Sequence, residues 1–110
     1  MTAVEAFAAL ADPTRRRIVE LLAQREYGAG ELAHRFDMTP PAVSQHLRVL
    51  RDAGLVRVRP QAQRRIYALA PDGLAELDAW LARFRRFWST HLDALERQLT
   101  DTDATRRNTP

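Results

Sequence analysis

The chain has 110 residues, the size of one small domain, and its seventeen basic and fourteen acidic residues give a formal net charge of +3 at pH 7. All of the basic residues are arginine, and cysteine is absent, which excludes disulfides, thiolate metal ligands and thiol-based redox sensing in this chain. No apolar run reaches membrane-spanning length and no signal-peptide pattern begins the chain, so we expect a soluble cytoplasmic protein with no membrane contact.

Two helices are predicted in the first quarter of the chain. The first is a short apolar helix, Val4–Leu10. Asp12 can then cap a second helix whose first position suits Pro13, because no backbone donor is needed there. The second helix has an apolar side and an arginine-rich side, which is typical of a scaffold helix with a solvated face. Residues 27–30 contain two glycines and are predicted to form a loop.

Two further helices, joined by a short turn, are predicted in the middle of the chain. Gly30–Phe36 is a short helical run, and Asp37–Met38 is the connection. The next helix extends over Thr39–Gly54: its threonine is a good N-cap, a proline follows at the first position, and glycine can end it in the left-handed conformation. Two helices connected in this way form a helix-turn-helix.

The second of these helices has two different faces. Val43, Leu47 and Leu50 fall together at 100° per residue and form a buried stripe. The opposite face carries side chains that donate and accept hydrogen bonds, as a DNA major groove requires. We therefore expect this helix to contact DNA, although a helical pair in any small bundle could look similar. The candidate contacts are Thr39, Pro41, Ser44, Gln45 and Arg48.

A basic hairpin is predicted directly after this helix. Leu55–Arg59 and Arg64–Leu69 alternate like strands, and Pro60–Gln63 is the turn between them. The segment between Asp52 and Asp72 contains four arginines and no acidic residue, so it can straddle phosphates or enter a minor groove. The alternative is a solvated hairpin whose charges only block edge pairing. The arginines are Arg57, Arg59, Arg64 and Arg65.

A long helix, about Leu74–Leu99, is predicted to follow, with apolar residues every three or four positions. So small a body cannot cover this stripe, which favours pairing with a second copy. Alternatively, its aromatic residues line a pocket for an apolar small-molecule effector. Residues 100–110 are polar and end in proline, so we expect one domain, residues 1–99, and a disordered tail. The expected interface residues are Val4, Phe7, Leu77, Trp80, Leu81, Phe84, Phe87, Trp88, Leu92 and Leu95.

Three motifs resemble the ArsR (arsenical-resistance regulator) family of bacterial winged-helix repressors, which act as homodimers. They read L-A-D-P-T-R-R-R-I, T-P-P-A-V-S-Q-H-L-R-V-L-R-D-A-G-L-V and R-R-I-Y-A-L, and the resemblance covers about residues 4–99. The aromatic final helix is similar to the branch of the family that lacks metal-binding cysteines. The resemblance implies a mainly α winged helix-turn-helix with a small β-hairpin and a long C-terminal dimerisation helix. Wings in this family commonly carry a tip glycine, and residues 60–63 contain none.

The metal sites of the family lack their donors here. Its cysteine motif would fall at Glu31–Phe36, where there is no thiolate. Its alternative site on the last helix retains Asp78 and His91, but Trp80 and Ala94 occupy the other two positions and cannot bind zinc. We therefore expect no metal and no cofactor.

Catalysis is not expected either. Ser44 and His46 are two residues apart on a helix, so they point about 200° away from each other and cannot share a proton. The sequence contains no glycine-rich phosphate loop and no nucleophile elbow.

These observations favour a sequence-specific transcriptional regulator that binds double-stranded DNA as a homodimer on an inverted repeat. We expect Gln45 to read adenine and the arginines to hold phosphates. Repression rather than activation follows only from the family resemblance. The alternative is the same fold working as a protein-interaction module, with the last helix pairing to a different chain.

Overall fold

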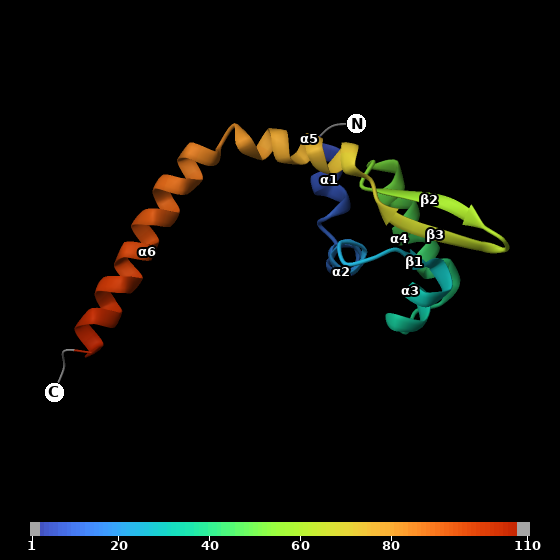
Figure 1. Ribbon diagram of the computed structural model, residues 1–110, viewed down its shortest axis with the longest axis horizontal. Coiled ribbons are helices and arrows are strands. Elements are labelled where there is room, and N and C mark those ends of the chain that lie inside the picture. The colour runs from blue at the N-terminus through green and yellow to red at the C-terminus, as the bar shows by residue number, and fades with distance from the viewer. Residues whose placement is uncertain (1–2, 108–110) are drawn as a thin grey trace. The chain divides into compact units, whose positions relative to one another are not determined.

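The computed structural model describes residues 3–107, with side chains for residues 3–100. The chain divides into two compact units at residues 78 and 79, and a fifth helix spans the division. Figure 1 labels the elements along the chain. In order they are α1 (Ala3–Ala9), α2 (Pro13–Leu22), β1 (Tyr27–Gly28), α3 (Ala29–Arg35), α4 (Pro40–Asp52), β2 (Val56–Gln61), β3 (Arg64–Leu69), α5 (Pro71–Ala82) and α6 (Arg85–Arg107).

The first unit contains a three-stranded antiparallel sheet in the order β1-β3-β2. The hairpin of β2 and β3 was predicted, but the loop prediction for residues 27–30 is wrong. Tyr27 and Gly28 form β1 and pair with Tyr67 and Ile66 of β3. The Tyr27 side chain is buried in the core, so its burial and the distant partner strand outweigh the two neighbouring glycines.

The core of the first unit lies between the helices and one face of this sheet, with α2, α3 and α4 all contacting strands. Val43, Leu47 and Leu50 are buried, which confirms the predicted inward stripe of α4. Tyr67 supplies the core from β3. The fully buried large side chains are Ile18, Leu32, Val43, Leu47, Leu50 and Leu55.

Both helices of the helix-turn-helix end in the same hydrogen-bonded motif. After α3, Asp37 has a φ of 52°, and the Met38 amide donates to the Ala33 carbonyl at 3.0 Å. After α4, Gly54 has a φ of 77°, and the Leu55 amide donates to the Leu50 carbonyl at 2.9 Å. In each case a residue in the left-handed conformation allows the amide of the following residue to donate a hydrogen bond to the carbonyl five residues earlier. This bond terminates the helix. The predicted turn and the predicted end at Gly54 are confirmed.

The wing, formed by β2 and β3, extends away from the helices of its unit in Figure 1. Its turn is shorter than predicted, because Pro60 and Gln61 belong to β2 and Gln61 pairs with Arg64. Only Ala62 and Gln63 remain between the strands. Ala62 has a φ of 57°, so it adopts the conformation that a tip glycine would otherwise supply.

The last helix is not continuous, so the prediction of one helix over residues 74–99 is wrong. α5 ends at Ala82, and the amides of Arg83 and Phe84 donate to carbonyls only three residues back. These bonds tighten the turn, and the rings of Trp80 and Phe84 are in tilted contact there, with centroids 4.7 Å apart and an interplanar angle of 49°. No helix of the described residues is long and apolar enough to cross a membrane.

The helix α6 continues past the predicted end at Leu99 to Arg107. The prediction of a disordered tail is therefore wrong for residues 100–107, and residues 108–110 lie outside the described part of the chain. No proline or glycine occurs in residues 100–107, so no residue there strongly disfavours the helix.

Candidate nucleic-acid interface

The five side chains predicted to contact DNA are all exposed at the start and along one face of α4. Thr39 is the N-cap of the helix, and Pro41, Ser44, Gln45 and Arg48 lie on the side opposite its buried stripe. The Thr39 hydroxyl accepts a hydrogen bond from the Ala42 amide at 3.3 Å, so it also caps the helix. Because the helix is held by its core side and by both caps, these polar groups project from a fixed backbone.

A hollow of about 400 Å³ separates α4 from the wing and brings one predicted wing residue next to the helix. Arg65 lines it together with Ser44 and Arg48. Arg51 also lines it and was missed by the sequence reasoning, although it lies seven residues after Ser44 and therefore on the same helix face. With Asp52 as the one acidic lining residue, three guanidinium groups make this hollow basic.

The four wing arginines do not form one surface. Arg65 lies two residues from Tyr67, so it shares the inner, core-facing side of the sheet. Arg64 pairs with Gln61, and Arg59 pairs with Ile66, which places these arginines on the outer side. Arg57 lies two residues before Arg59 and is on the outer side as well. The pleat therefore turns only Arg65 toward α4.

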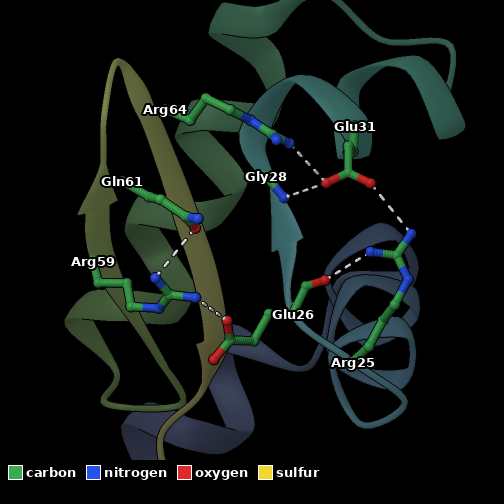
Figure 2. A network of polar contacts seen from close by, with 7 residues as sticks. All are labelled: Arg25, Glu26, Gly28, Glu31, Arg59, Gln61 and Arg64. Carbon is green, nitrogen blue, oxygen red and sulfur yellow. Dashed lines mark hydrogen bonds and ion pairs between the residues drawn. The ribbon is translucent and has the colours of Figure 1, made fainter.

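Two arginines of the outer side are paired with carboxylates from the residue before β1 and from α3, as Figure 2 shows. Arg59 donates to Glu26, and Arg64 donates to Glu31 at 3.0 Å. The segment between Asp52 and Asp72 has no acidic residue of its own, so the carboxylates that neutralise these two arginines come from outside it. Glu26 and Glu31 are distant in sequence, but β1 lies beside β3 and brings them to the wing.

Glu31 is the centre of this network. It accepts hydrogen bonds from the Gly28 amide at 3.0 Å and from Arg25 at 3.2 Å, in addition to Arg64. The Gly28 amide, followed by the Arg25 side chain, lowers the pKa of Glu31 below its ordinary value. Glu31 therefore stays ionised at neutral pH and holds the first turn of α3.

A second polar cluster fixes the inner flank of α4 against α2. The Asp12 carboxylate accepts from the Arg15 amide at 3.0 Å, which confirms the predicted cap and lowers the pKa of Asp12. His46 is half-buried, with its Nδ1 3.9 Å from the Asp12 carboxylate and 3.5 Å from the Arg15 guanidinium. His46 is thus directed toward α2, whereas Ser44 is exposed on the other side of the helix.

The predicted interface residues differ in exposure. In the first unit, Val4 and Phe7 are exposed, but Leu77 packs against the core of its own unit. In the second unit, Trp80 and Leu81 are half-buried. The other predicted members, and Leu99 beyond them, leave large apolar side chains open to solvent. These are Phe84, Phe87, Trp88, Leu92 and Leu95.

An effector pocket lined by the aromatic residues of the last helix is the alternative prediction for the second unit. Leu81, Trp88 and Leu92 line a shallow hollow of about 350 Å³ with Arg85 and Ser89. Among the side chains described for residues 3–100, no group of three or more histidines, aspartates or glutamates is placed to hold a metal ion.

Comparison with known proteins identifies the family of this fold. Residues 12–58 match the model of the bacterial regulatory proteins of the arsR family. The HTH-type transcriptional regulator Rv2034 of Mycobacterium tuberculosis is 54% identical over 72% of this chain and 74% of its own length. The transcriptional repressor SdpR of Bacillus subtilis is 33% identical over 71% and 87%. A crystal structure of an ArsR family transcriptional regulator, RHA00566, superposes with a TM-score of 0.68 at 35% identity, covering 77% of this chain and 88% of that one. The chain belongs to the ArsR family, and it is a winged helix-turn-helix transcriptional regulator.

Proposed function

We propose that the chain binds a specific inverted-repeat operator as a homodimer and represses transcription there. The observation that carries this proposal is the exposed polar face of α4, which lies beside the basic hollow of Arg48, Arg51 and Arg65. A major groove admits one helix, and the flanking phosphates match guanidinium groups on either side of it.

Each of the five predicted contact residues has a role in this proposal. Gln45 reads adenine through its amide, which can donate and accept at once. Ser44 and Pro41 lie at base edges or thymine methyl groups, and Thr39 lies near the backbone at the start of the helix. Arg48 holds a phosphate. These assignments follow from the order of the residues along the exposed face.

The wing arginines add contacts that carry no sequence information. Arg65 is best placed for this role, because it lines the hollow beside α4. Arg57 can bind a phosphate without breaking an ion pair, since none of the described side chains forms one with it. Arg59 and Arg64 contact DNA only by exchanging their carboxylate partners for phosphates.

A second copy of the chain is proposed to cover the apolar stripe of the second unit. Trp88, Leu92, Leu95 and Leu99 recur at intervals of four, three and four residues, the spacing of a helix that packs against another helix. Val4 and Phe7 are exposed on α1 and are proposed as further contacts with the second copy. Two copies related by a twofold axis would place their α4 helices in successive major grooves of an inverted repeat.

Repression is proposed because the relative SdpR is named a repressor and because a bound dimer can block polymerase directly. The bacterial chromosome is the target, so the cytoplasm is the proposed location. The test is a gel shift and footprint with the DNA upstream of the gene for this protein. We expect a protected inverted repeat whose half-sites are centred about 10 base pairs apart. Uniform protection along the duplex would contradict specific binding, if competitor DNA of random sequence removes it as well as competitor DNA of the upstream sequence does.

A further inference from the structure

Two of the three arginines on the outer side of the wing are already paired with carboxylates. Arg59 and Arg64 come from the two strands of the hairpin, and Glu26 and Glu31 come from the segment that includes β1 and the start of α3. We call these contacts the outer-face ion pairs, Arg59–Glu26 and Arg64–Glu31. Arg57 and Arg65 form no ion pair with any side chain in the described residues.

The carboxylate of Glu31 is held in place before Arg64 reaches it. Its Oε1 accepts from the Gly28 amide, and its Oε2 accepts from Arg25. Arg25 is itself fixed, because it donates to the Glu26 carbonyl at 2.8 Å and lies 3.7 Å from the centre of the Tyr27 ring. Figure 2 shows this arrangement, with Arg64 above Gly28 and directed at Glu31.

A carboxylate offers arginine the same kind of contact as a phosphate, with paired oxygens that accept from the guanidinium group. An arginine that moves to DNA must leave its glutamate behind, unpaired and close to the negative backbone. The outer-face ion pairs are more than a third exposed, so solvent screens them and each pair contributes little to stability. Phosphate can therefore displace the glutamates. Each exchange, however, adds less binding affinity for DNA than a phosphate contact by an unpaired arginine would add.

From this arrangement we propose that Glu26 and Glu31 compete with DNA phosphates for Arg59 and Arg64 and thereby restrain the sequence-independent affinity of the wing. The inference rests on the proposed function, because it concerns the same DNA-binding surface. It gives the two acids a regulatory role: a regulator with weaker non-specific binding is less occupied by the many competing sites of a chromosome.

The test uses Glu31→Gln in the full chain and a random-sequence duplex, titrated from 50 to 200 mM salt. Glutamine keeps an oxygen for the Gly28 amide, so the cap of α3 is retained while the charge is lost. Each arginine freed for phosphate steepens the dependence of log affinity on log salt by about 0.9, or about 1.8 for a dimer. The variant should bind more tightly at 50 mM and lose about 12-fold more affinity than wild type over this range.

A matched control removes the same charge elsewhere. Glu20→Gln lies on the exposed side of α2, and Glu20 forms no ion pair with the described side chains. Its salt dependence should stay close to that of wild type. Adding Arg64→Ala to Glu31→Gln should abolish the gain, because the arginine that the gain requires is gone. Equal behaviour of Glu31→Gln and Glu20→Gln would overturn the proposal.

Two further variants test the proposal if Glu31→Gln does not fold. Glu26→Gln frees Arg59 without touching the cap of α3, and it should steepen the salt dependence in the same way. Gly28→Ala changes no charge, but its Cβ would lie 2.9 Å from Arg64 Nη2 and should push that side chain away from Glu31. Weaker binding to random DNA by both variants would show that the acids position the arginines instead, and it would overturn the proposal.

The two proposals fail in different ways. The salt dependence of Glu31→Gln on random DNA tests the outer-face ion pairs, whereas the footprint on upstream DNA tests specific recognition. A wild-type protein with a clear footprint and an unaltered Glu31→Gln salt dependence retains the proposed function and loses this inference. A protein whose Glu31→Gln variant gains affinity for random DNA, but which protects no inverted repeat, retains the inference alone.

Discussion

Gly73 lies against the backbone of Gly54, so closely that a Cβ on Gly73 would be 1.9 Å from the Gly54 carbonyl oxygen. Gly54 is the left-handed residue that ends α4, and Gly73 belongs to the first turn of α5. The start of α5 therefore packs directly on the end of α4, and only glycine at position 73 permits this approach.

Gly73→Ala should destabilise the protein by about 1–3 kcal/mol or more, because backbone rather than a flexible side chain must move. Urea unfolding measures the change. Gly30→Ala is the matched control: Gly30 lies within α3, and a Cβ there would meet nothing within 4 Å. That substitution should be neutral or stabilise by about 0.4–1 kcal/mol. Equal losses in the two variants would contradict the contact argument.

Gln45→Ala should weaken binding to the operator by about 1–3 kcal/mol and change binding to random DNA little. The reason is that an amide bidentate to adenine discriminates bases, whereas phosphates are the same in every duplex. Arg48→Ala is the comparison, because loss of a phosphate contact should weaken both DNAs by similar factors. Fluorescence anisotropy with both duplexes measures these effects. If Gln45→Ala weakens both equally, this residue does not read a base.

Trp88→Ala combined with Phe84→Ala should convert the proposed dimer into monomers, because two large aromatic side chains leave the apolar stripe. Sedimentation equilibrium at low micromolar concentration measures the association, and circular dichroism checks that the chain is folded. Thr90→Ala is the control: Thr90 lies about 200° around the same helix from Trp88, so its replacement should not affect association. A folded double variant that remains dimeric would place the interface elsewhere.

Local signals were sufficient to predict the helix-turn-helix. Thr39 and Pro40 begin α4, Gly54 ends it, and a stripe with a period of 3.6 residues faces the core. Each of these features acts within a few residues, so a single sequence displays it. The alternation of apolar and basic residues after Gly54 likewise predicted the two strands of the wing.

Features that depend on distant partners could not be predicted in this way. The strand β1 has two residues and exists only because β3 pairs with it. Glu31 and Arg64 are 33 positions apart, so their ion pair requires the sheet order β1-β3-β2. The end of α5 at Ala82 has no proline or glycine to mark it; what accompanies the break is a pair of hydrogen bonds that span three residues and the contact of the Trp80 and Phe84 rings.

Asp12→Asn should make the protein less sensitive to acid. The Arg15 amide is the main cause that lowers the pKa of Asp12 in the folded protein. Because the pKa of Asp12 is lower in the folded than in the unfolded protein, its ionised carboxylate stabilises the fold at any pH above the unfolded-state pKa. This stabilisation is lost as the pH falls through the folded-state pKa. Asparagine keeps an oxygen for the cap but does not titrate. Urea unfolding should therefore show a smaller loss of stability between about pH 5 and 2 in the variant than in wild type. An identical loss would mean that this carboxylate does not contribute to acid unfolding.

Arg65→Ala should reduce the salt dependence of DNA binding more than Arg64→Ala does. Arg65 faces the hollow beside α4 and forms no ion pair with the described side chains, so a phosphate contact gains its full counterion release. Its loss should lower the slope of log affinity against log salt by about 0.9 for each copy, or about 1.8 for a dimer.

Arg64 must first leave Glu31, and its replacement by alanine should lower the slope by clearly less. Salt titrations of both variants on operator and random DNA measure the difference. Equal reductions would mean that the pleat of the wing does not separate the two arginines as DNA ligands. A loss for Arg65→Ala confined to the operator would mean that this arginine reads bases or a narrow minor groove, because phosphate contacts weaken both duplexes alike.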